Sequence, residues 1–276
     1  ELDWLFKMQE TDGSVLMKVA VEGYQSASPP SSDSAARRYG SAQASSTNAF
    51  ASMMAHAYLT YKDVTGMTTY ANNCLSAAED AWNYLETNTY PISNYDNAGF
   101  SSSNPEKSEA IQKKMYITSA VYLYAATGTT KYKTFVENNY TSYMPNQFGF
   151  WWNVYDSVSQ DALLYYASLS GSSTAVKNNI NNAFISEINS GDEFLIAVNN
   201  KLDPYRSHID DYMYGWGSNR EKCHTGLIFY NMQTYNLDSS NHTKYKNAAE
   251  DFLHFMHGVN AVNLVMLSNM YDYGGD

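Results

Sequence analysis

Apolar residues recur at helical spacing through most of the chain. In the first segment, ELDWLFKMQ (residues 1–9), apolar side chains fall near one helical face, and an Asp-Gly pair ends the pattern. Ser45-Ser46-Thr47 is typical of a helix cap, so we expect a helix through residues 49–64. Small residues are frequent in that helix, which favours close approach of its neighbours.

One pattern recurs along the chain: a helix ends in a short Thr/Ser-Gly turn, and a second helix starts a few residues later. It is found at residues 61–85, 122–140 and 165–184, and a fourth copy at 235–256 lacks the glycine. In each copy a Gly or Asn can adopt the left-handed C-cap, and Ser or Thr can cap the next helix. All of these segments are therefore predicted to be helical hairpins.

Repeated helical hairpins separated by long polar loops are typical of a closed ring or a solenoid. Strand signals are sparse: FLIAVNN (194–200) is the best candidate, while the Pro and Ser content of QSASPPSSDS (25–34) predicts a loop. We therefore predict an all-α fold, a toroid of paired helices, with residues 1–276 in a single domain. Function is expected in the loops between hairpins.

Composition narrows the classes of function. Apolar residues make up 44% of the chain and charged residues 16%, which is typical of a globular protein. The net charge of −11 leaves no basic patch for nucleic acid. No stretch approaches ~18 consecutive apolar residues, so no membrane span is expected. Few Lys and Arg beside many Ser, Asn, Thr and Tyr favour a secreted or cell-surface protein.

The cysteine and histidine residues do not form a metal-binding motif. Cys74 and Cys223 lie far apart and form no zinc-type cluster, so two buried free thiols are expected, with a disulfide as the alternative. His254 and His257 lie about one helical turn apart, but nothing nearby in the sequence completes a metal site. No cofactor is expected, and no motif demands calcium.

Aromatic residues are unusually frequent, with 25 Tyr, 11 Phe and 5 Trp. Tyrosine has an apolar body and a polar tip, which suits polyhydroxylated ligands, although any single tyrosine can equally pack between helices. Three loops (108–120, 146–166 and 210–230) bring aromatic and hydrogen-bonding side chains to helix starts. The candidate substrate-binding residues are Tyr116, Trp151, Trp152, Tyr155, Asp156, Trp216 and Arg220.

If the hairpins form a ring, these loops share one face and form an aromatic cleft with interspersed polar groups, which suits a polysaccharide. Trp216 stands between Gly215 and Gly217. Because glycine has no side chain to cover the indole, these neighbours favour Trp216 as a stacking platform for a sugar ring over the alternative, in which Trp216 is a core anchor. For the polar residues, an N-cap at Asp156 and a surface salt bridge at Arg220 remain as alternatives.

Other polar residues are weaker candidates for chemistry. His224 falls inside the helix that follows the Trp216 loop and is predicted to be packed. Asp210 and Asp211 are adjacent, and adjacent side chains do not face each other in regular structure, so they do not predict a catalytic pair.

Five stretches, in order along the chain, resemble the catalytic module of glycoside hydrolase family 9, the inverting cellulases built on an (α/α)6 barrel. They are ELDWLFKMQETDGSVLMKV, RRYGSAQASSTNAFASMMAHAYLTY, MYITSAVYLYAATGTTKY, YGWGSN and FLHFMHGVNAVNLVMLSNM. The resemblance implies an (α/α)6 barrel-type fold that is incomplete in this chain. It also implies hydrolysis of β-1,4-glucan or cellulose by the intact parent, with β-glucan or cello-oligosaccharide as the ligand.

The resemblance also implies residue roles. Trp216 and Arg220 resemble a stacking tryptophan and the arginine four residues after it, which line the sugar subsites. The run from Trp151 to Tyr155 and Asp156 resembles an aromatic-to-Asp segment that lines other sugar subsites in the family. Tyr116 is similar to an aromatic residue of the family that contacts the substrate. Some family members bind calcium near the cleft.

Two departures concern the chemistry. The chain has no DAGD motif, whose aspartates activate water in the family, and Ala261 stands where the family's closing helix has proline, ahead of the general-acid Glu. We therefore expect that the catalytic residues lie outside this chain and that the module is cut at both ends. The chain alone is expected to be inactive and to supply the substrate cleft. Competing interpretations are a non-catalytic glycan-binding or surface protein, and another (α/α) barrel enzyme with a catalytic pair among these residues.

Overall fold

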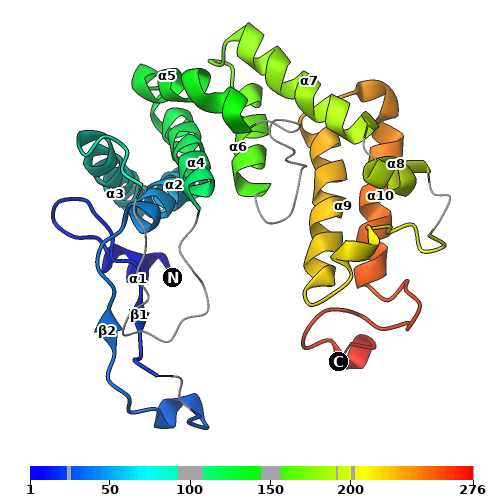
Figure 1. Ribbon diagram of the computed structural model, residues 1–276, viewed down its shortest axis with the longest axis horizontal. Coiled ribbons are helices and arrows are strands. Elements are labelled where there is room, and N and C mark those ends of the chain that lie inside the picture. The colour runs from blue at the N-terminus through cyan, green and yellow to red at the C-terminus, as the bar shows by residue number, and fades with distance from the viewer. Residues whose placement is uncertain (24–25, 93–107, 144–156, 191, 200–202, 276) are drawn as a thin grey trace. The chain divides into compact units, whose positions relative to one another are not determined.

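The computed structural model describes residues 1–23, 26–92, 108–143, 157–190, 192–199 and 203–275. The α-helices are α1 (Leu2–Phe6), α2 (Ala44–Tyr61), α3 (Thr68–Thr87), α4 (Glu109–Thr127), α5 (Thr130–Asn139), α6 (Ser157–Ser168), α7 (Thr174–Ser190), α8 (Asp192–Asn199), α9 (Ser218–Thr234) and α10 (His242–Met256). The strands are β1 (Val19–Ala20) and β2 (Arg38–Tyr39). Figure 1 labels these elements and confirms the all-α class.

The chain divides into two compact units, Glu1–Tyr140 and Thr141–Asp276. Each unit buries apolar side chains of its own and contains two of the predicted hairpins.

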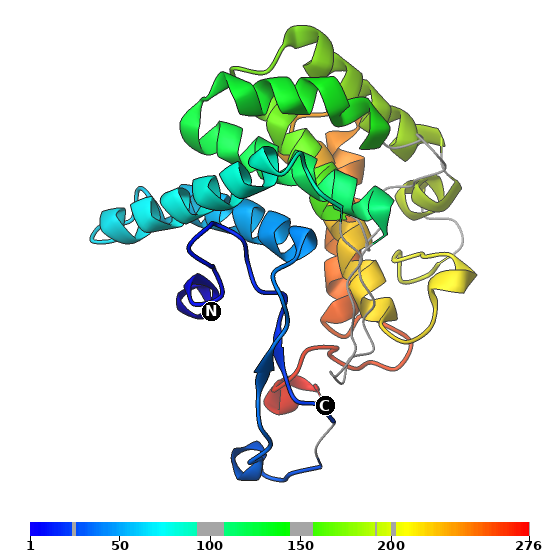
Figure 2. The same cartoon turned by 60° about the vertical axis from the view of Figure 1, so that its left-hand side comes forward.

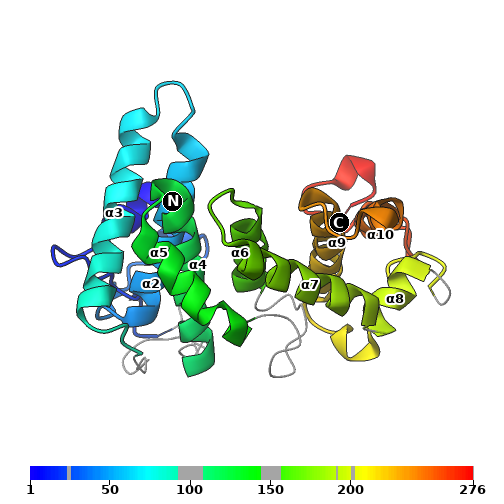
Figure 3. The same cartoon turned by 90° about the horizontal axis from the view of Figure 1, so that it is seen from above.

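The first unit is built from the hairpins α2–α3 and α4–α5. α2 packs against both α3 and α4, and Figures 2 and 3 show α2 and α3 lying side by side. Gly128 (φ +68°) is the left-handed C-cap of α4, as predicted. Gly66 (φ +83°) is also left-handed, but it lies in the turn before α3, and the C-cap of α2 is Lys62 in the right-handed region. The small side chains of Ala51 and Ala55 are fully buried in α2, as the close approach of helices requires.

The Ser45-Ser46-Thr47 segment does not cap its helix, contrary to the prediction. Gln43 occupies the N-cap position, and the helix begins at Ala44. The hydroxyl of Thr47 accepts a hydrogen bond from the Val15 amide at 2.9 Å, and the hydroxyl of Ser46 donates to the Val15 carbonyl at 2.7 Å. The same hydroxyls donate to the Gln43 carbonyl, at 3.0 Å from Ser46 and 2.7 Å from Thr47, so they join the first turn of α2 to the backbone of a distant residue.

The N-terminal segment is held against α3. The side-chain amide of Gln9 donates to the Ala77 carbonyl at 2.9 Å. Gly13 has a left-handed backbone (φ +91°), and a Cβ placed there would lie 2.4 Å from the Asp80 carbonyl oxygen. The chain then forms the short antiparallel strand pair β1–β2, in which Val19 lies opposite Tyr39. Figure 2 shows this strand pair projecting away from the helices.

The second unit contains the hairpins α6–α7 and α9–α10. Helices α9 and α10 lie side by side, as seen along their length in Figure 1 and end-on in Figure 3. The turn between them has no glycine, and Asn236 (φ +54°) and Asp238 (φ +46°) take the left-handed conformation instead. Asn and Asp tolerate this region better than other non-glycine residues, so the predicted hairpin forms without glycine.

The strand prediction for FLIAVNN (194–200) is wrong, because residues 194–199 belong to helix α8. Phe194 and Ala197, three residues apart, are both buried. The Phe194 ring meets the Phe229 ring of α9 edge-on at a centroid distance of 5.9 Å. A short apolar run is compatible with either structure, and tertiary packing decides between them.

Both cysteines are free thiols, as expected over a disulfide, but only Cys74 is buried. Cys223 lies on the same exposed stripe of α9 as Leu227 and Tyr230, four and seven residues further along. Desolvation by the surrounding protein raises the pKa of both thiols, including that of the exposed Cys223, so accessibility is expected to decide which one reacts.

We expect one thiol per native chain to react with a chromogenic disulfide reagent and a second to react only after unfolding in guanidinium. The Cys223→Ser variant should lose the native-state reaction and keep the second. Rapid reaction of two thiols in the native wild type would contradict this assignment.

Candidate functional site

The loop of residues 203–217 leads into α9 and carries Trp216 near its end. The exposed fraction of Trp216 is 103% of the reference value for tryptophan, so the whole indole is open to solvent. Gly217 is left-handed (φ +90°), and a Cβ placed on Gly215 or Gly217 would find no atom within 4 Å. The core-anchor interpretation of Trp216 is therefore wrong, and both faces of the ring are accessible.

Two tyrosines of the same loop are also exposed. Tyr212 (63% exposed) lies in the 3-10 helix η3 (Asp211–Met213), and Tyr214 (54% exposed) follows directly. Alternate residues from 212 to 216 thus carry aromatic rings that face water. Large apolar surface exposed in a cluster is typical of a binding surface, and aromatic rings stack on the apolar faces of sugars.

Arg220 lies in the first turn of α9, one turn after Trp216. Its side chain is mostly exposed, with a guanidinium nitrogen 3.8 Å from a carboxylate oxygen of the buried Glu221. The backbone amide of Arg220 donates to the Gly217 carbonyl at 2.8 Å, which fixes the start of the helix relative to the loop. The surface salt bridge expected as an alternative is thus present, at a long distance that contributes little to stability.

The upstream arm of the loop is organised by Asp203. One carboxylate oxygen accepts from the Tyr205 amide at 2.8 Å, and the other accepts from the Ser207 amide at 2.9 Å. The Ser207 hydroxyl also donates to Asp203, at 3.3 Å. His208 follows, with Nε2 3.5 Å from a carboxylate oxygen of Asp210. An Asp side chain that binds the next amides is a common way to stabilise a turn.

The sequence interpretation missed Lys222, which is only 1% exposed. Its ammonium group donates to the Ser207 carbonyl at 2.5 Å and to the Tyr214 hydroxyl at 3.2 Å. Desolvation lowers the pKa of Lys222 to about 8, and the charge of Asp203 opposes that change. The sequence did contain a signal for the burial of Lys222, because this lysine is in helical phase with Gly226 and Phe229 on the buried stripe of α9.

The structure places Tyr116 in the core of the first unit, in α4, and not at a surface. The residue is 3% exposed, and its hydroxyl donates to the Pro91 carbonyl at 2.8 Å. Its ring lies edge-on to Trp82 and Tyr90, at centroid distances of 6.4 and 5.4 Å. Burial raises the pKa of its hydroxyl, as expected for a packed phenol. Tyr116 therefore does not belong to the exposed aromatic surface around Trp216.

The remaining candidates, Trp151, Trp152, Tyr155 and Asp156, lie outside the described residues. Their assignment to sugar subsites stays a prediction from the sequence.

His224 is packed, as predicted. Its Nε2 is buried and has no hydrogen-bond partner among the described residues. Desolvation, with a smaller contribution from the Arg220 charge, lowers its pKa to about 4. The imidazole is consequently neutral at physiological pH.

Two further features bear on the sequence predictions. Within the ranges that the structure describes, no group of three or more His, Cys, Asp or Glu side chains is placed to hold a metal ion. No helix in those same ranges is long and apolar enough to cross a membrane.

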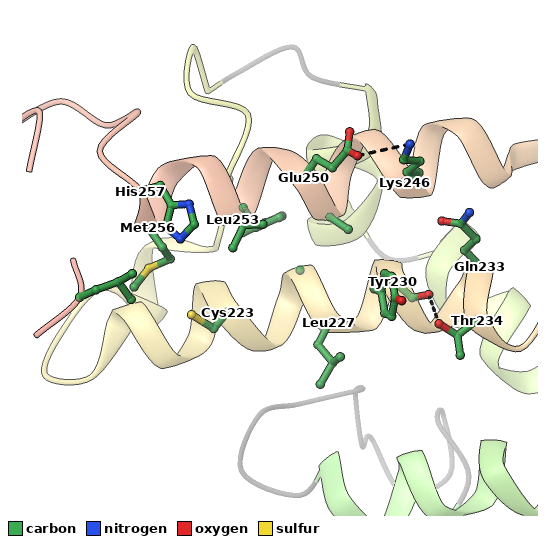
Figure 4. Close-up of a pocket in the computed structure, with 14 residues that line it drawn as sticks. Cys223, Leu227, Tyr230, Gln233, Thr234, Lys246, Glu250, Leu253, Met256 and His257 are labelled. Carbon is green, nitrogen blue, oxygen red and sulfur yellow. Dashed lines mark hydrogen bonds and ion pairs between the residues drawn. The ribbon is translucent and has the colours of Figure 1, made fainter. Parts of the chain in front are cut away.

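A groove of about 790 Å³ is lined mainly by residues of α9 and α10, with Leu267 from the segment that follows α10. Figure 4 shows Leu227 and Tyr230 of α9 and Leu253 of α10 among its lining residues, with the ion pair of Lys246 and Glu250 on α10. Neither Trp216 nor Arg220 lines it. Most of its lining is apolar, so it offers few partners for sugar hydroxyls, and the Trp216 loop is the better candidate for a glycan.

The close contact of the two helices beside this groove depends on Gly226. A Cβ placed there would lie 2.9 Å from the Phe252 Cβ of α10, so a larger residue would push the helices apart.

The profile of glycosyl hydrolase family 9 matches residues 1–274. The chain therefore belongs to this family. A comparison with curated protein sequences gave no match.

Several solved structures are similar over nearly the whole chain. A metagenome-derived glycoside hydrolase family 9 endoglucanase has a TM-score of 0.78 and 21% identity, covering 97% of this chain and 46% of its own. The family 9 endoglucanase J30 has a TM-score of 0.75 and 23% identity, with coverages of 95% and 46%. AaCel9A in complex with a cellobiose-like isofagomine has a TM-score of 0.77 and 18% identity, with coverages of 96% and 48%.

At these identities the likeness shows the fold alone. The prediction of an (α/α)6 barrel-type fold, incomplete in this chain, is confirmed by these structures. The chain spans about half the length of the solved structures it matches.

Proposed function

We propose that the chain provides a sugar-binding surface of a β-1,4-glucan hydrolase, with Trp216 as its principal stacking platform. The observation that carries this proposal is a fully exposed indole between two glycines, at the entry to α9. Exposing an indole to water is unfavourable, so a ligand that covers it gains the hydrophobic free energy of that surface.

Family membership supports the choice of ligand. Two of the similar structures are family 9 endoglucanases, and a third, AaCel9A, is in complex with a cellobiose-like isofagomine. Pyranose rings of a β-1,4-glucan have apolar faces that stack on indole. Arg220, one turn further on, supplies guanidinium donors for the rim of hydroxyls.

The reaction proposed for the parent protein is hydrolysis with inversion, as the resemblance implies. An acid protonates the glycosidic oxygen while a carboxylate on the other face activates water, at a separation of ~6.5–9.5 Å. Neither role is assigned to a residue of this chain. Its contribution is binding energy remote from the cleaved bond, which positions and distorts the sugar at the reacting centre.

The proposal is tested by calorimetric titration of the chain with cellohexaose, together with tryptophan fluorescence. We expect saturable binding and a change in emission, because the fully exposed indole would move from water to a sugar face. The proposal would be overturned if millimolar cellohexaose gave neither a heat of binding nor a change in tryptophan emission.

A further inference from the structure

The ammonium group of Lys222 lies where the Trp216 loop meets α9 and α10. It donates to the Ser207 carbonyl at 2.5 Å and approaches the Ser207 hydroxyl at 3.4 Å on the upstream arm of the loop. On the downstream arm it donates to the Tyr214 hydroxyl at 3.2 Å. One buried charge thus joins two points of the loop that are seven residues apart.

Two aromatic rings complete the surroundings of this charge. The nitrogen lies 5.1 Å from the ring centroid of Tyr214 and 4.2 Å from that of Phe255 in α10. Both distances are within the range of cation–π attraction. Asp203, which binds the Ser207 amide and hydroxyl, provides the negative charge that acts on this site.

A buried lysine is an expensive way to hold a helix in place. Desolvation opposes the charge, and replacing buried ionic groups by apolar residues of similar size is often neutral or stabilising. The contacts of Lys222 in the loop are directional, however, and an apolar side chain cannot make them. Tyr214 is only two residues from Trp216, so the position of this tyrosine constrains the platform.

We propose that Lys222 is a positioning residue for the Trp216 platform: its ammonium group fixes both arms of the 203–217 loop and so holds the indole in the orientation that receives a sugar. This inference rests on the proposed function. Lys222 is only 1% exposed, so its proposed role is to position the loop and not to contact the sugar.

The test is the Lys222→Met variant, which keeps the length of the side chain and removes the hydrogen bonds and the charge. Three readings are compared with wild type: thermal stability, cellohexaose affinity, and amide hydrogen exchange of residues 203–217. We expect about tenfold weaker binding by the folded chain and faster exchange in the loop, while the melting temperature reports separately what the loss of the buried donor costs. A purely structural role predicts a lower melting temperature with the folded fraction binding normally.

Phe252→Leu is the matched control. Phe252 is fully buried in α10 and its ring packs on Phe229, so the variant should lose stability without a change in loop exchange or affinity. If Lys222→Met does not fold, Tyr214→Phe removes one acceptor alone and should give faster loop exchange.

Unchanged exchange in residues 203–217 would overturn the proposal, whatever the affinity. Faster exchange with unchanged affinity would also overturn it, because the loop would then be ordered without consequence for the ligand. If wild type does not bind cellohexaose, the proposed function fails, and the platform role fails with it. The exchange data would then still decide whether Lys222 orders the loop.

Discussion

Replacing Trp216 by alanine is expected to weaken cellohexaose binding by ~1–3 kcal/mol, about 5- to 150-fold, by analogy with the stacking of bases on aromatic side chains. The free energy of unfolding should change by less than about 0.5 kcal/mol, because the indole makes no buried contact that the substitution could remove. Calorimetric titration and chemical denaturation of the same preparation measure the two effects separately.

Trp4 provides the matched control. It is also an exposed tryptophan, at 50%, but it lies in α1 of the first unit. Trp4→Ala should leave the affinity unchanged, and the ligand-induced emission change should persist in this variant and disappear in Trp216→Ala. Equal losses of affinity in both variants would show that binding is not localised at the Trp216 loop.

Replacing Gly13 by alanine is expected to destabilise the first unit by ~2–5 kcal/mol. The left-handed backbone (φ +91°) opposes any Cβ by ~1–2 kcal/mol, and crowding in a packed interior adds ~1–3 kcal/mol. The crowding is severe because the Cβ would lie 2.4 Å from the Asp80 oxygen and 2.9 Å from the Asp80 carbonyl carbon. Both are backbone atoms of α3, so they can move only if the helix moves.

Gly66→Ala separates the two contributions. Gly66 has a similar backbone (φ +83°), but a Cβ there would find no atom within 4 Å. The control should therefore show only the conformational contribution of ~1–2 kcal/mol. Urea denaturation of the two variants measures the difference, and equal destabilisation would mean that the N-terminal segment does not press on α3 as the structure shows.

The hairpins could be predicted from the sequence because their signals are local. The chain must reverse direction between paired helices, and Gly66 and Gly128 adopt a left-handed backbone in these turns without contact to other parts of the chain. The same reasoning applies to the platform. An indole flanked by two glycines has little local cover, and the structure shows Trp216 fully exposed.

Where a residue's role depends on distant partners, the sequence pattern was insufficient. Tyr116 is aromatic, like Trp216, but it lies about two turns into α4 and packs against Trp82 and Tyr90, because α4 turns that face inward. The hydroxyls of Ser46 and Thr47 bind the backbone of Val15 as well as the Gln43 carbonyl at the start of their own helix. Both outcomes depend on long-range contacts that no short window of sequence contains.

Lys222 shows the same limit at the candidate site. Its type predicts a solvated side chain, because lysine is rarely buried without a partner. Its partners, Ser207 and Tyr214, come together only when the loop folds back over α9. Helix positions and chain reversals therefore followed from local conformational preferences. The burial of Tyr116 and Lys222, the helical state of residues 194–199 and the support of the Trp216 loop were decided by tertiary contacts, because hydrogen bonding and desolvation depend on what surrounds a group in space.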